Sequence, residues 1–440
     1  RISSFAEEAG IFPEWQFGFR KGKSTVTAAT ILYEAVNSRL NAKPTSKPTY
    51  VAFIDFSKCF DSIRRDYLYI KLQKAGIPFA ICKLLHFIYT NTKSYIISGI
   101  HLVNYFESTI GLPQGCGLSP ILFCIFVHDL PEFLSHKGVI FHQSTLKFLQ
   151  FADDLALLAT CPKDLQTALN DLARYCTMNG LLINTGKTKV LVFHKGRLTK
   201  STFRIDKRDI EIVNSFTYLG FTFTPQLKFS KHLQNVTAKA ASKSGVLFAK
   251  LKPLDISLDI AIDLFNCYIL PIYTYGLGLW IGKCSENTIN ASNAVFTKFL
   301  KRYLGIPYRS NNAITHFITE TKPLLTTLQN LSQKSINSMT FPKLLDGYKL
   351  ALTNYTSAAE LYNPIPSVPT SFWMSKTFHS LPIYARNRKL LCRDIFDVKH
   401  FDICNNQNFH VRPTTDCVCT ACGENATPYH HYSCKTYHPH

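Results

Sequence analysis

The most restrictive feature of this sequence is a pair of adjacent aspartates enclosed by apolar residues. Asp153 and Asp154 lie between the mostly apolar stretch 146–151 and the apolar stretch 155–158. Both flanks have the length and composition of a strand, so the pattern predicts a hairpin with the two aspartates at its turn. Buried like charges repel each other and resist ionisation, a cost that a bound cation removes. An exposed turn, which is a common setting for aspartate, avoids the same cost, so these residues alone leave both interpretations open.

The composition indicates a folded protein with an anionic partner. The chain has 440 residues, of which 46% are hydrophobic and 13% aromatic, enough for two or three domains with large cores. Its formal net charge of +20 on a globular chain points to a polyanion, most often nucleic acid. An anionic membrane surface is the weaker interpretation, because we find no amphipathic basic terminus.

The cysteines and the apolar runs restrict the compartment. Most of the 14 cysteines are scattered singly in apolar runs, as Cys124 is, which is typical of buried thiols in a reducing compartment. No signal peptide opens the sequence, and its longest apolar run, 121–127, is far too short to span a bilayer. We therefore expect no membrane partner. Because the first residue is Arg1 rather than Met, we expect a fragment of a longer protein.

A basic loop, residues 17–25, precedes a predicted helix over 27–40 that Ser24 or Thr25 can cap. Cations at the N-terminus of a helix suit a phosphate, and a solvated basic turn is the alternative. The loop resembles a phosphate-binding P-loop, but three residues instead of four separate Gly18 from Gly22 and no clear strand precedes it. We therefore set aside a P-loop NTPase.

Two further segments suggest a binding site. Residues 50–56 predict a buried strand that ends near a single aspartate, Asp55, although a lone aspartate is more often a cap or turn residue. Residues 111–120 hold three glycines and two prolines, which predicts an irregular loop whose backbone can approach a ligand closely. Gln114 in this loop is a candidate hydrogen-bond donor to a substrate. We expect a buried helix over 120–130 to follow.

The next segments predict an amphipathic helix over 164–180, a strand over 181–183, a turn that carries Lys187, and a returning strand over 190–193. An ordinary exposed lysine is the alternative for Lys187. Residues 225–254 hold six lysines and no acidic residue, so they predict a helix with a basic edge that can follow a phosphate backbone. The lysines on that edge are Lys239, Lys243 and Lys250.

A cluster of metal-ligand residues closes the sequence. Four cysteine and histidine residues within a short stretch fit one tetrahedral Zn²⁺, and such a short knuckle usually contacts nucleic acid. A disulfide interpretation would need an oxidising compartment, which nothing supports. The expected ligands are Cys419, Cys422, His430 and Cys434, with Cys417 and His431 as substitutes.

Taken together, these segments resemble the reverse transcriptase of LINE-type non-LTR retrotransposons. The motifs occur in the order of that family, a phenylalanine precedes Ala-Asp-Asp, and a Cys-Cys-His-Cys knuckle follows. The motifs lie at 17–25, 51–61, 111–120, 151–154, 180–188 and 218–220. Each motif is modest by itself, whereas six in order are highly specific.

The resemblance implies an α+β fold of the right-hand polymerase type, with fingers, palm and thumb. It is followed by a mostly helical C-terminal region and the small zinc knuckle. We expect fingers and palm in residues 1–225, a helical thumb in 226–320, a connector of unknown role in 321–410 and the knuckle in 411–440.

The resemblance also implies roles for single residues. Asp55, Asp153 and Asp154 match the carboxylates that hold two Mg²⁺ ions, which agrees with the oxygen ligands that Mg²⁺ prefers and with the two cations that phosphoryl transfer to a 3′-hydroxyl needs. Further roles concern the incoming nucleotide. Phe60 matches the gate under its sugar, Gln114 and the adjacent Gly115 match the loop that contacts it, Arg20 and Lys23 match the cations that neutralise its triphosphate, and Lys187 matches the lysine proposed to protonate pyrophosphate.

The expected function is an RNA-directed DNA polymerase that extends a DNA 3′-end with dNTPs on an RNA template. RNA template, DNA primer or target and dNTPs are the expected partners, and the family implies a nuclear location. A maturase-type reverse transcriptase is an alternative, against which the knuckle and Phe151 argue. A decayed or domesticated copy that binds nucleic acid without catalysis is another, against which the intact aspartates argue.

Overall fold

The protein is described by a computed structural model that covers residues 2–95, 97–98, 101–102, 105–196, 201–254, 256–337, 401–402 and 412–413. The chain divides into two compact units, Arg1–His232 and Leu233–His440, which we call the mixed unit and the helical unit. The division falls within the first turn of helix α8 (Ser230–Leu251).

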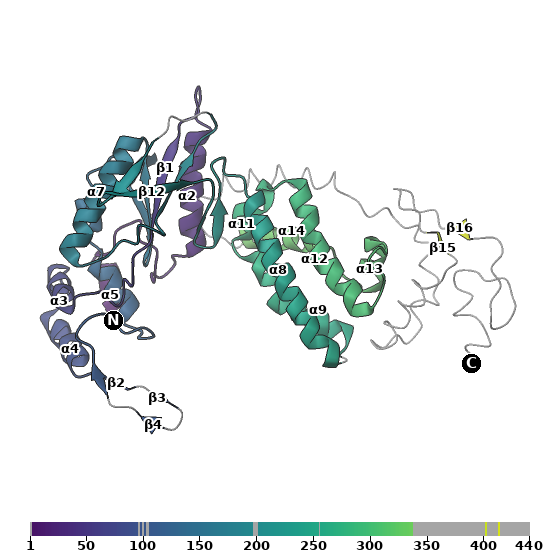
Figure 1. Ribbon diagram of the computed structural model, residues 1–440, viewed down its shortest axis with the longest axis horizontal. Coiled ribbons are helices and arrows are strands. Elements are labelled where there is room, and N and C mark those ends of the chain that lie inside the picture. The colour runs from purple at the N-terminus through teal and green to yellow at the C-terminus, as the bar shows by residue number, and fades with distance from the viewer. Residues whose placement is uncertain are drawn as a thin grey trace. The chain divides into compact units, whose positions relative to one another are not determined.

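A six-stranded sheet forms the centre of the mixed unit (Figure 1). Its order is β11-β12-β10-β1-β9-β8, and every neighbouring pair is antiparallel except β10 with β12. The strands are β1 (Thr49–Ile54), β8 (Phe148–Phe151), β9 (Asp154–Ala159), β10 (Lys189–Phe193), β11 (Phe203–Ile205) and β12 (Arg208–Val213).

Helices cover both faces of this sheet, with α7 and α2 on opposite sides of the strands in Figure 1. Side chains of β1 alternate between the faces, so the whole strand is buried. Tyr50, Ala52 and Ile54 join the larger core, whereas Phe53 stacks at 4.4 Å on Phe216 on the other face. The helices of the unit are α1 (Ile2–Glu8), α2 (Thr25–Leu40), α3 (Arg65–Lys74), α4 (Phe79–Thr90), α5 (Ser119–Phe126), α6 (Leu130–Phe133) and α7 (Pro162–Asn179).

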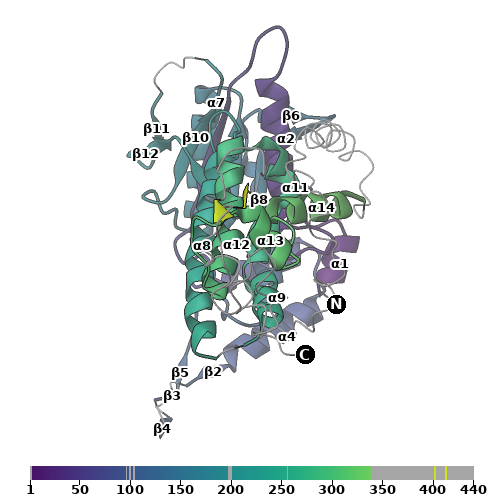
Figure 2. The same ribbon diagram turned by 90° about the vertical axis from the view of Figure 1, so that its right-hand side faces the viewer.

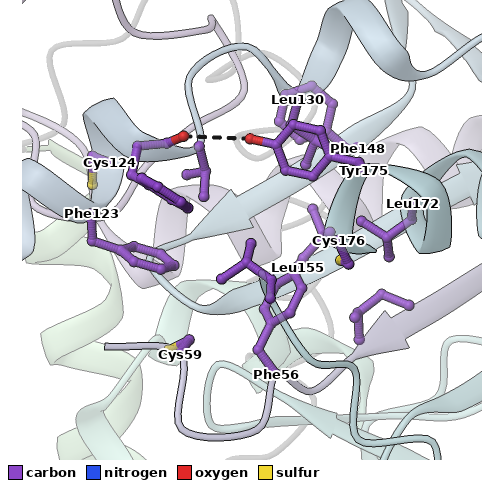
Figure 3. Close-up of a cluster of buried hydrophobic side chains, with 14 of the residues drawn as sticks. Phe56, Cys59, Phe123, Cys124, Leu130, Phe148, Leu155, Leu172, Tyr175 and Cys176 are labelled. Atoms are coloured by element: carbon purple, nitrogen blue, oxygen red, sulfur yellow. Dashed lines mark hydrogen bonds between the residues drawn. The ribbon is translucent and has the colours of Figure 1, made fainter. Parts of the chain in front are cut away.

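The larger core lies between the sheet and helices α5 and α7. Phe148 and Leu155 of the sheet belong to the same buried cluster as Leu172 and Cys176 of α7 (Figure 3), and each fully buried leucine or phenylalanine contributes about 1.5–3 kcal/mol. Four short two-stranded ribbons complete the unit. They are β2 (Lys93–Ser94) with β5 (Phe106–Glu107), β3 (Ile97–Ser98) with β4 (His101–Leu102), β6 (Val139–Phe141) with β7 (Ser144–Leu146), and β13 (Phe216–Tyr218) with β14 (Phe221–Phe223).

Helix ends follow the local signals in the sequence. The Ser24 hydroxyl accepts a hydrogen bond from the Thr27 N–H at 3.0 Å, which caps α2 as predicted. Helix α7 ends at Gly180, whose φ of 69° is the left-handed conformation that glycine adopts readily.

Two local predictions are wrong. The predicted strand over 181–183 reduces to one bridge between Ile183 and Phe56, because the chain there connects α7 to the turn beside β1. The predicted helix over 120–130 ends at Phe126, and the short α6 begins at Leu130. Pro131 has no N–H to donate, so α5 cannot continue regularly through it.

The helical unit contains α8, α9 (Leu258–Tyr268), α10 (Leu270–Thr274), α11 (Leu277–Trp280), α12 (Glu286–Leu304), α13 (Asn312–Ile318) and α14 (Leu324–Asn337), and β15 (Phe401–Asp402) pairs with β16 (Arg412–Pro413). Helices α8 and α12 lie side by side in Figures 1 and 2, where the Thr237 and Ser292 hydroxyls form a 2.8 Å hydrogen bond.

The helices of the described residues differ in length and apolarity from those that span a bilayer, with one bent pair as the exception. No helix there meets the length and apolarity of a span by itself. Leu258–Thr274 and Leu277–Lys283 meet them only as a pair bent by 51°.

Candidate active site

Three aspartates gather at one end of the central sheet. The last residue of β1, Ile54, pairs with Leu155 in the antiparallel strand β9, so Asp55 follows at the end where Asp154 begins β9. Asp153 occupies the tight turn between β8 and β9, in which Ala152 has a φ of 56°. The hairpin predicted for Asp153 and Asp154 is therefore present, and long-range strand pairing adds Asp55 to it.

The electrostatics of this corner are those of crowded like charges. Asp154 is exposed at its surface, yet the surrounding protein desolvates its carboxyl, and this effect, followed by the charges of Asp153 and Asp55, raises its pKa to about 6. None of the ion pairs found in the described residues includes these aspartates. Two negative charges beside a third carboxylate are the electrostatic setting that a bound cation relieves.

The arrangement is not a preformed cage. Within the described ranges, no group of three or more His, Cys, Asp or Glu side chains is placed so that it could hold a metal ion. The three carboxylates share one end of the sheet and act on one another through their charges, and their oxygens are of the type that Mg²⁺ prefers.

The turn that carries Lys187 is tied to the same corner. The N–H of Asp55 donates to the Thr188 hydroxyl at 3.2 Å, and the carbonyl of Asp55 accepts from the Asn184 N–H at 2.8 Å. The Lys187 N–H donates to the Asn184 side chain at 3.2 Å, and the Lys187 side chain is exposed. The backbone of this turn therefore lies beside the aspartates.

The loop with Gln114 lies beside the segment that follows β1. Gln114 is exposed and donates from Nε2 to Asp61 Oδ1 at 3.3 Å. Gly115 has a φ of 86° with open space around it, a conformation that glycine tolerates. The half-buried ring of Phe60 lies 4.8 Å from the ring of Phe123 on α5.

The basic loop packs against the turn between β8 and β9. The Phe17 N–H donates to the Gln150 carbonyl at 2.7 Å, and a Cβ on Gly18 would lie 2.3 Å from the backbone nitrogen of Ala152. Only glycine allows this approach, which places the start of the basic loop against the turn that carries Asp153.

The two cations of that loop, Arg20 and Lys23, differ in the groups that they contact. The Arg20 guanidinium, 12% exposed, forms two hydrogen bonds with the Glu7 carboxylate at 2.8 and 2.7 Å and donates to the carbonyl of Pro13 at 2.8 Å. The Lys23 ammonium lies 4.8 Å from the centre of the Phe17 ring, and burial followed by the charge of Arg20 lowers its pKa. Arg20 thus fastens the loop to α1, which leaves Lys23 as the better candidate for a phosphate.

These motifs and their arrangement agree with a comparison against known families. The model of the family described as "Reverse transcriptase (RNA-dependent DNA polymerase)" matches residues 1–223. This chain belongs to the reverse transcriptase family. The resemblance inferred from the motifs is therefore confirmed.

Several proteins that are similar in sequence to this reverse transcriptase come from mobile elements. A probable RNA-directed DNA polymerase from transposon X-element of Drosophila melanogaster is 27% identical over 72% of this chain and 34% of its own length. The RNA-directed DNA polymerase from mobile element jockey of the same species is 24% identical over 76% of this chain and 36% of its own. A Pol polyprotein from the type-1 retrotransposable element R2 of Popillia japonica is 28% identical over 52% of this chain and 38% of its own. The chain thus spans about a third of the length of these relatives.

Among solved structures, apo telomerase from Candida tropicalis is similar with a TM-score of 0.43 and 14% identity, over 79% of this chain and 59% of that one.

Three residues of the reverse transcriptase site carry no local signal in the sequence. The buried Cys59 thiol lies beside Asp153, whose charge, after burial, raises the thiol pKa to about 12. Asp61 holds Gln114, and Thr188 holds the backbone of Asp55. Each acts on a residue distant in sequence, so only the folded chain reveals its partner.

The remaining predicted site residues lie elsewhere. Lys239, Lys243 and Lys250 are exposed on α8 in the helical unit. That unit also has a groove of about 500 Å³ between α8 and α12, bordered by the cations Lys298 and Arg302. The predicted zinc ligands Cys419, Cys422, His430 and Cys434 lie outside the described residues, so the knuckle stays a prediction from ligand type and spacing.

Proposed function

We propose that this chain is the polymerase portion of a retrotransposable element and copies RNA into DNA by adding dNTPs to a DNA 3′-end. The observation that carries the proposal is the gathering of Asp55, Asp153 and Asp154 at one end of the sheet. Membership of the reverse transcriptase family and the names of the relatives support the same activity.

We further propose that Asp55, Asp153 and Asp154 hold two Mg²⁺ ions. The raised pKa of Asp154 beside two further carboxylates supports a cation at this place. When bound, two such ions activate the primer 3′-hydroxyl and stabilise the leaving pyrophosphate. Strand β1 and the hairpin of β8 and β9 bring the three carboxylates to one end of the sheet, where they would supply the oxygen ligands.

The surrounding side chains suit an incoming dNTP. Phe60, backed by Phe123, presents a ring where a 2′-hydroxyl would clash, so it favours deoxyribose. Gln114 and the open backbone at Gly115 can contact the nucleotide, and Lys23 can offset the charge of its triphosphate. Lys187 lies in the turn that is hydrogen-bonded to Asp55, and in this proposal its exposed ammonium donates a proton to pyrophosphate.

The finer architecture is also a proposal. In a right-hand polymerase the mixed unit would supply fingers and palm, and residues 226–320 the thumb. The exposed row Lys239, Lys243 and Lys250 would then contact the phosphates of the template and primer. An RNA template and a DNA primer or target are the partners that this arrangement implies.

Primer extension tests the proposal. We would anneal a DNA primer to an RNA template, add Mg²⁺ and dNTPs, and compare the parent chain with Asp153→Ala. Asp209→Ala is the matched control, because Asp209 is a 71% exposed aspartate that pairs with Arg204 on the surface of β12. Extension by the parent and the control but not by Asp153→Ala is the expected result. Salt-sensitive RNA binding without any extension by the parent would instead indicate a non-catalytic binder.

A further inference from the structure

Arg65 connects two motifs of the candidate site that are distant in sequence. It is the first residue of α3 and lies on the segment 60–65, which begins with Phe60. The second motif is the loop over residues 108–115, which we call the Gln114 loop.

The guanidinium of Arg65 holds the start of the Gln114 loop by hydrogen bonds to its backbone. Nε donates to the Gly111 carbonyl at 2.9 Å, Nη1 donates to the Ser108 carbonyl, and Nη2 donates to the Ile110 carbonyl at 3.4 Å. Nη1 also donates to the Tyr89 carbonyl at 3.3 Å, and the group lies 5.1 Å from the centre of the Tyr89 ring. Five N–H groups in a planar fork can satisfy several carbonyls at once, which no other side chain can do.

Backbone hydrogen bonds to the segment 60–65 hold the same loop. The Gly111 N–H donates to the Ile63 carbonyl and the Leu112 N–H to the Phe60 carbonyl, both at 2.8 Å. Gly111 has a φ of 85°, and a Cβ there would lie 2.7 Å from the Asp61 carbonyl oxygen. The loop therefore rests directly on the segment that carries Phe60.

The contact between Arg65 and the Gln114 loop also affects the position of Gln114. Gln114 follows Gly111 closely and is held at 3.3 Å by Asp61 from the same segment. Arg65 therefore fixes where Gln114 lies relative to Phe60. The hydrogen bonds of Arg65 go to carbonyl groups and to the Ser108 hydroxyl. None of the ion pairs of the described residues includes Arg65.

We propose that Arg65 is a positioning residue for nucleotide binding: its guanidinium sets the Gln114 loop against Phe60 so that an incoming dNTP meets both in one geometry. Arg65 does not itself touch the nucleotide. The inference rests on the proposed polymerase function and adds to it a determinant of dNTP affinity.

The test compares Arg65→Met and Arg65→Lys with the matched control Arg64→Met. Arg64 is the neighbouring arginine, and its partner is Asp66 on the surface. The first measurement is the Kd of the next correct dNTP for a complex of the protein, an RNA template and a dideoxy-terminated DNA primer, in which no chemistry occurs. The second is the dNTP KM and kcat with an extendable primer, and the third is amide hydrogen exchange of residues 108–115.

We expect Arg65→Met to weaken dNTP binding about ten-fold or more, because a displaced contact group loses affinity steeply. We expect KM to rise with it, the exchange of residues 108–115 to quicken, and the affinity for template and primer to stay unchanged. Arg65→Lys should recover only part of the dNTP affinity, because a single ammonium cannot reproduce the planar fork. Arg64→Met should behave as the parent.

If a folded Arg65→Lys variant has the dNTP affinity or the hydrogen exchange of the parent, the positioning role of Arg65 is wrong. Primer extension by the parent would in that case still support the proposed polymerase activity. If the parent binds the dNTP in the terminated complex but extends no primer, the proposed polymerase activity is wrong. The dNTP Kd values of the parent and the Arg65 variants would still decide the role of Arg65. A parent without dNTP binding would overturn both.

Discussion

Gly18 shows how one missing side chain shapes the candidate site. The basic loop approaches the turn of Asp153 so closely that a Cβ on Gly18 would lie 2.3 Å from the Ala152 nitrogen, a backbone atom that cannot rotate away. The residue therefore sets how closely the basic loop packs against the turn of Asp153.

We predict that Gly18→Ala costs about 1–3 kcal/mol of unfolding free energy, the range of overpacking, and at least ten-fold in primer extension. The substitution must push the loop or the turn away from its place. Urea denaturation and extension rates measure the two effects. Gly196→Ala, at a site with open space around it, should leave both quantities unchanged; equal behaviour of the two variants would contradict the prediction.

At the scale of elements, a buried ion pair joins α3, the end of α5 and α7. The Lys71 ammonium contacts Asp129 at 2.7 Å, the Tyr175 hydroxyl at 2.9 Å and the Phe126 carbonyl at 2.8 Å, and the Tyr175 hydroxyl also donates to Asp129 at 2.7 Å. Tyr175 is one of the buried side chains of the core in Figure 3. This network connects the helices behind the sheet that carries the aspartates.

We predict that Lys71→Met lowers the unfolding free energy by about 3 kcal/mol, because it leaves the Asp129 charge partly buried without its cation. Lys71→Met combined with Asp129→Leu should recover much of that loss, since neither charge then remains. Denaturation of the parent, the single and the double variant measures both effects. A double variant that is no more stable than the single variant would show that the charge is not the cause.

Helix α13 carries a second buried polar group, His316. Its Nε2 and Nδ1 lie 2.8 and 2.9 Å from the hydroxyls of Thr297 and Thr321. Burial, followed by the charge of Lys301, lowers its pKa to about 4, so the folded chain holds the neutral imidazole.

This shift predicts a loss of stability in acid. Between pH 6.5, the ordinary value, and about 4, the unfolded chain binds a proton that the folded chain does not, so stability rises with pH through this window. At pH 5 His316 should destabilise the fold by about 2 kcal/mol relative to pH 7. Denaturation of the parent at both pH values, compared with His316→Gln, measures this contribution, and the variant should show a smaller difference. An equal pH dependence of the two proteins would exclude His316 as the source.

At the scale of the whole molecule, the net charge of +20 concerns binding rather than folding. Each lysine that meets a phosphate releases counterions, so affinity for nucleic acid falls as salt rises. The exposed row on α8 is the part of the helical unit where we expect such contacts.

We predict that replacing Lys239, Lys243 and Lys250 by Gln reduces the slope of log affinity against log salt by about two to three, close to one per lost phosphate contact. Binding of an RNA and DNA hybrid at several salt concentrations measures the slope. The matched control replaces Lys74, Lys83 and Lys163 in the mixed unit, and an equal reduction there would mean that charge alone, without position, decides binding.

The sequence alone determined the local elements and the family. The apolar flanks of Asp153 and Asp154 dictate the hairpin of β8 and β9, Ser24 and Gly180 mark helix ends, and the order of motifs identifies a reverse transcriptase. These inferences succeed because each depends on residues near one another in the chain, where spacing and backbone preference decide the structure.

Only the tertiary structure decided which distant residues meet. Strand pairing brings Asp55 to Asp154, and the Glu7 carboxylate forms an ion pair with Arg20. Arg65 donates to the Gly111 carbonyl in the Gln114 loop. The predicted strand over 181–183 is absent although the segment is apolar. The segment links α7 to the turn beside β1, and only Ile183 forms a bridge there. Partners of this kind depend on how whole elements pack, and a side chain's hydrogen bonds across that packing leave no periodic pattern in the sequence.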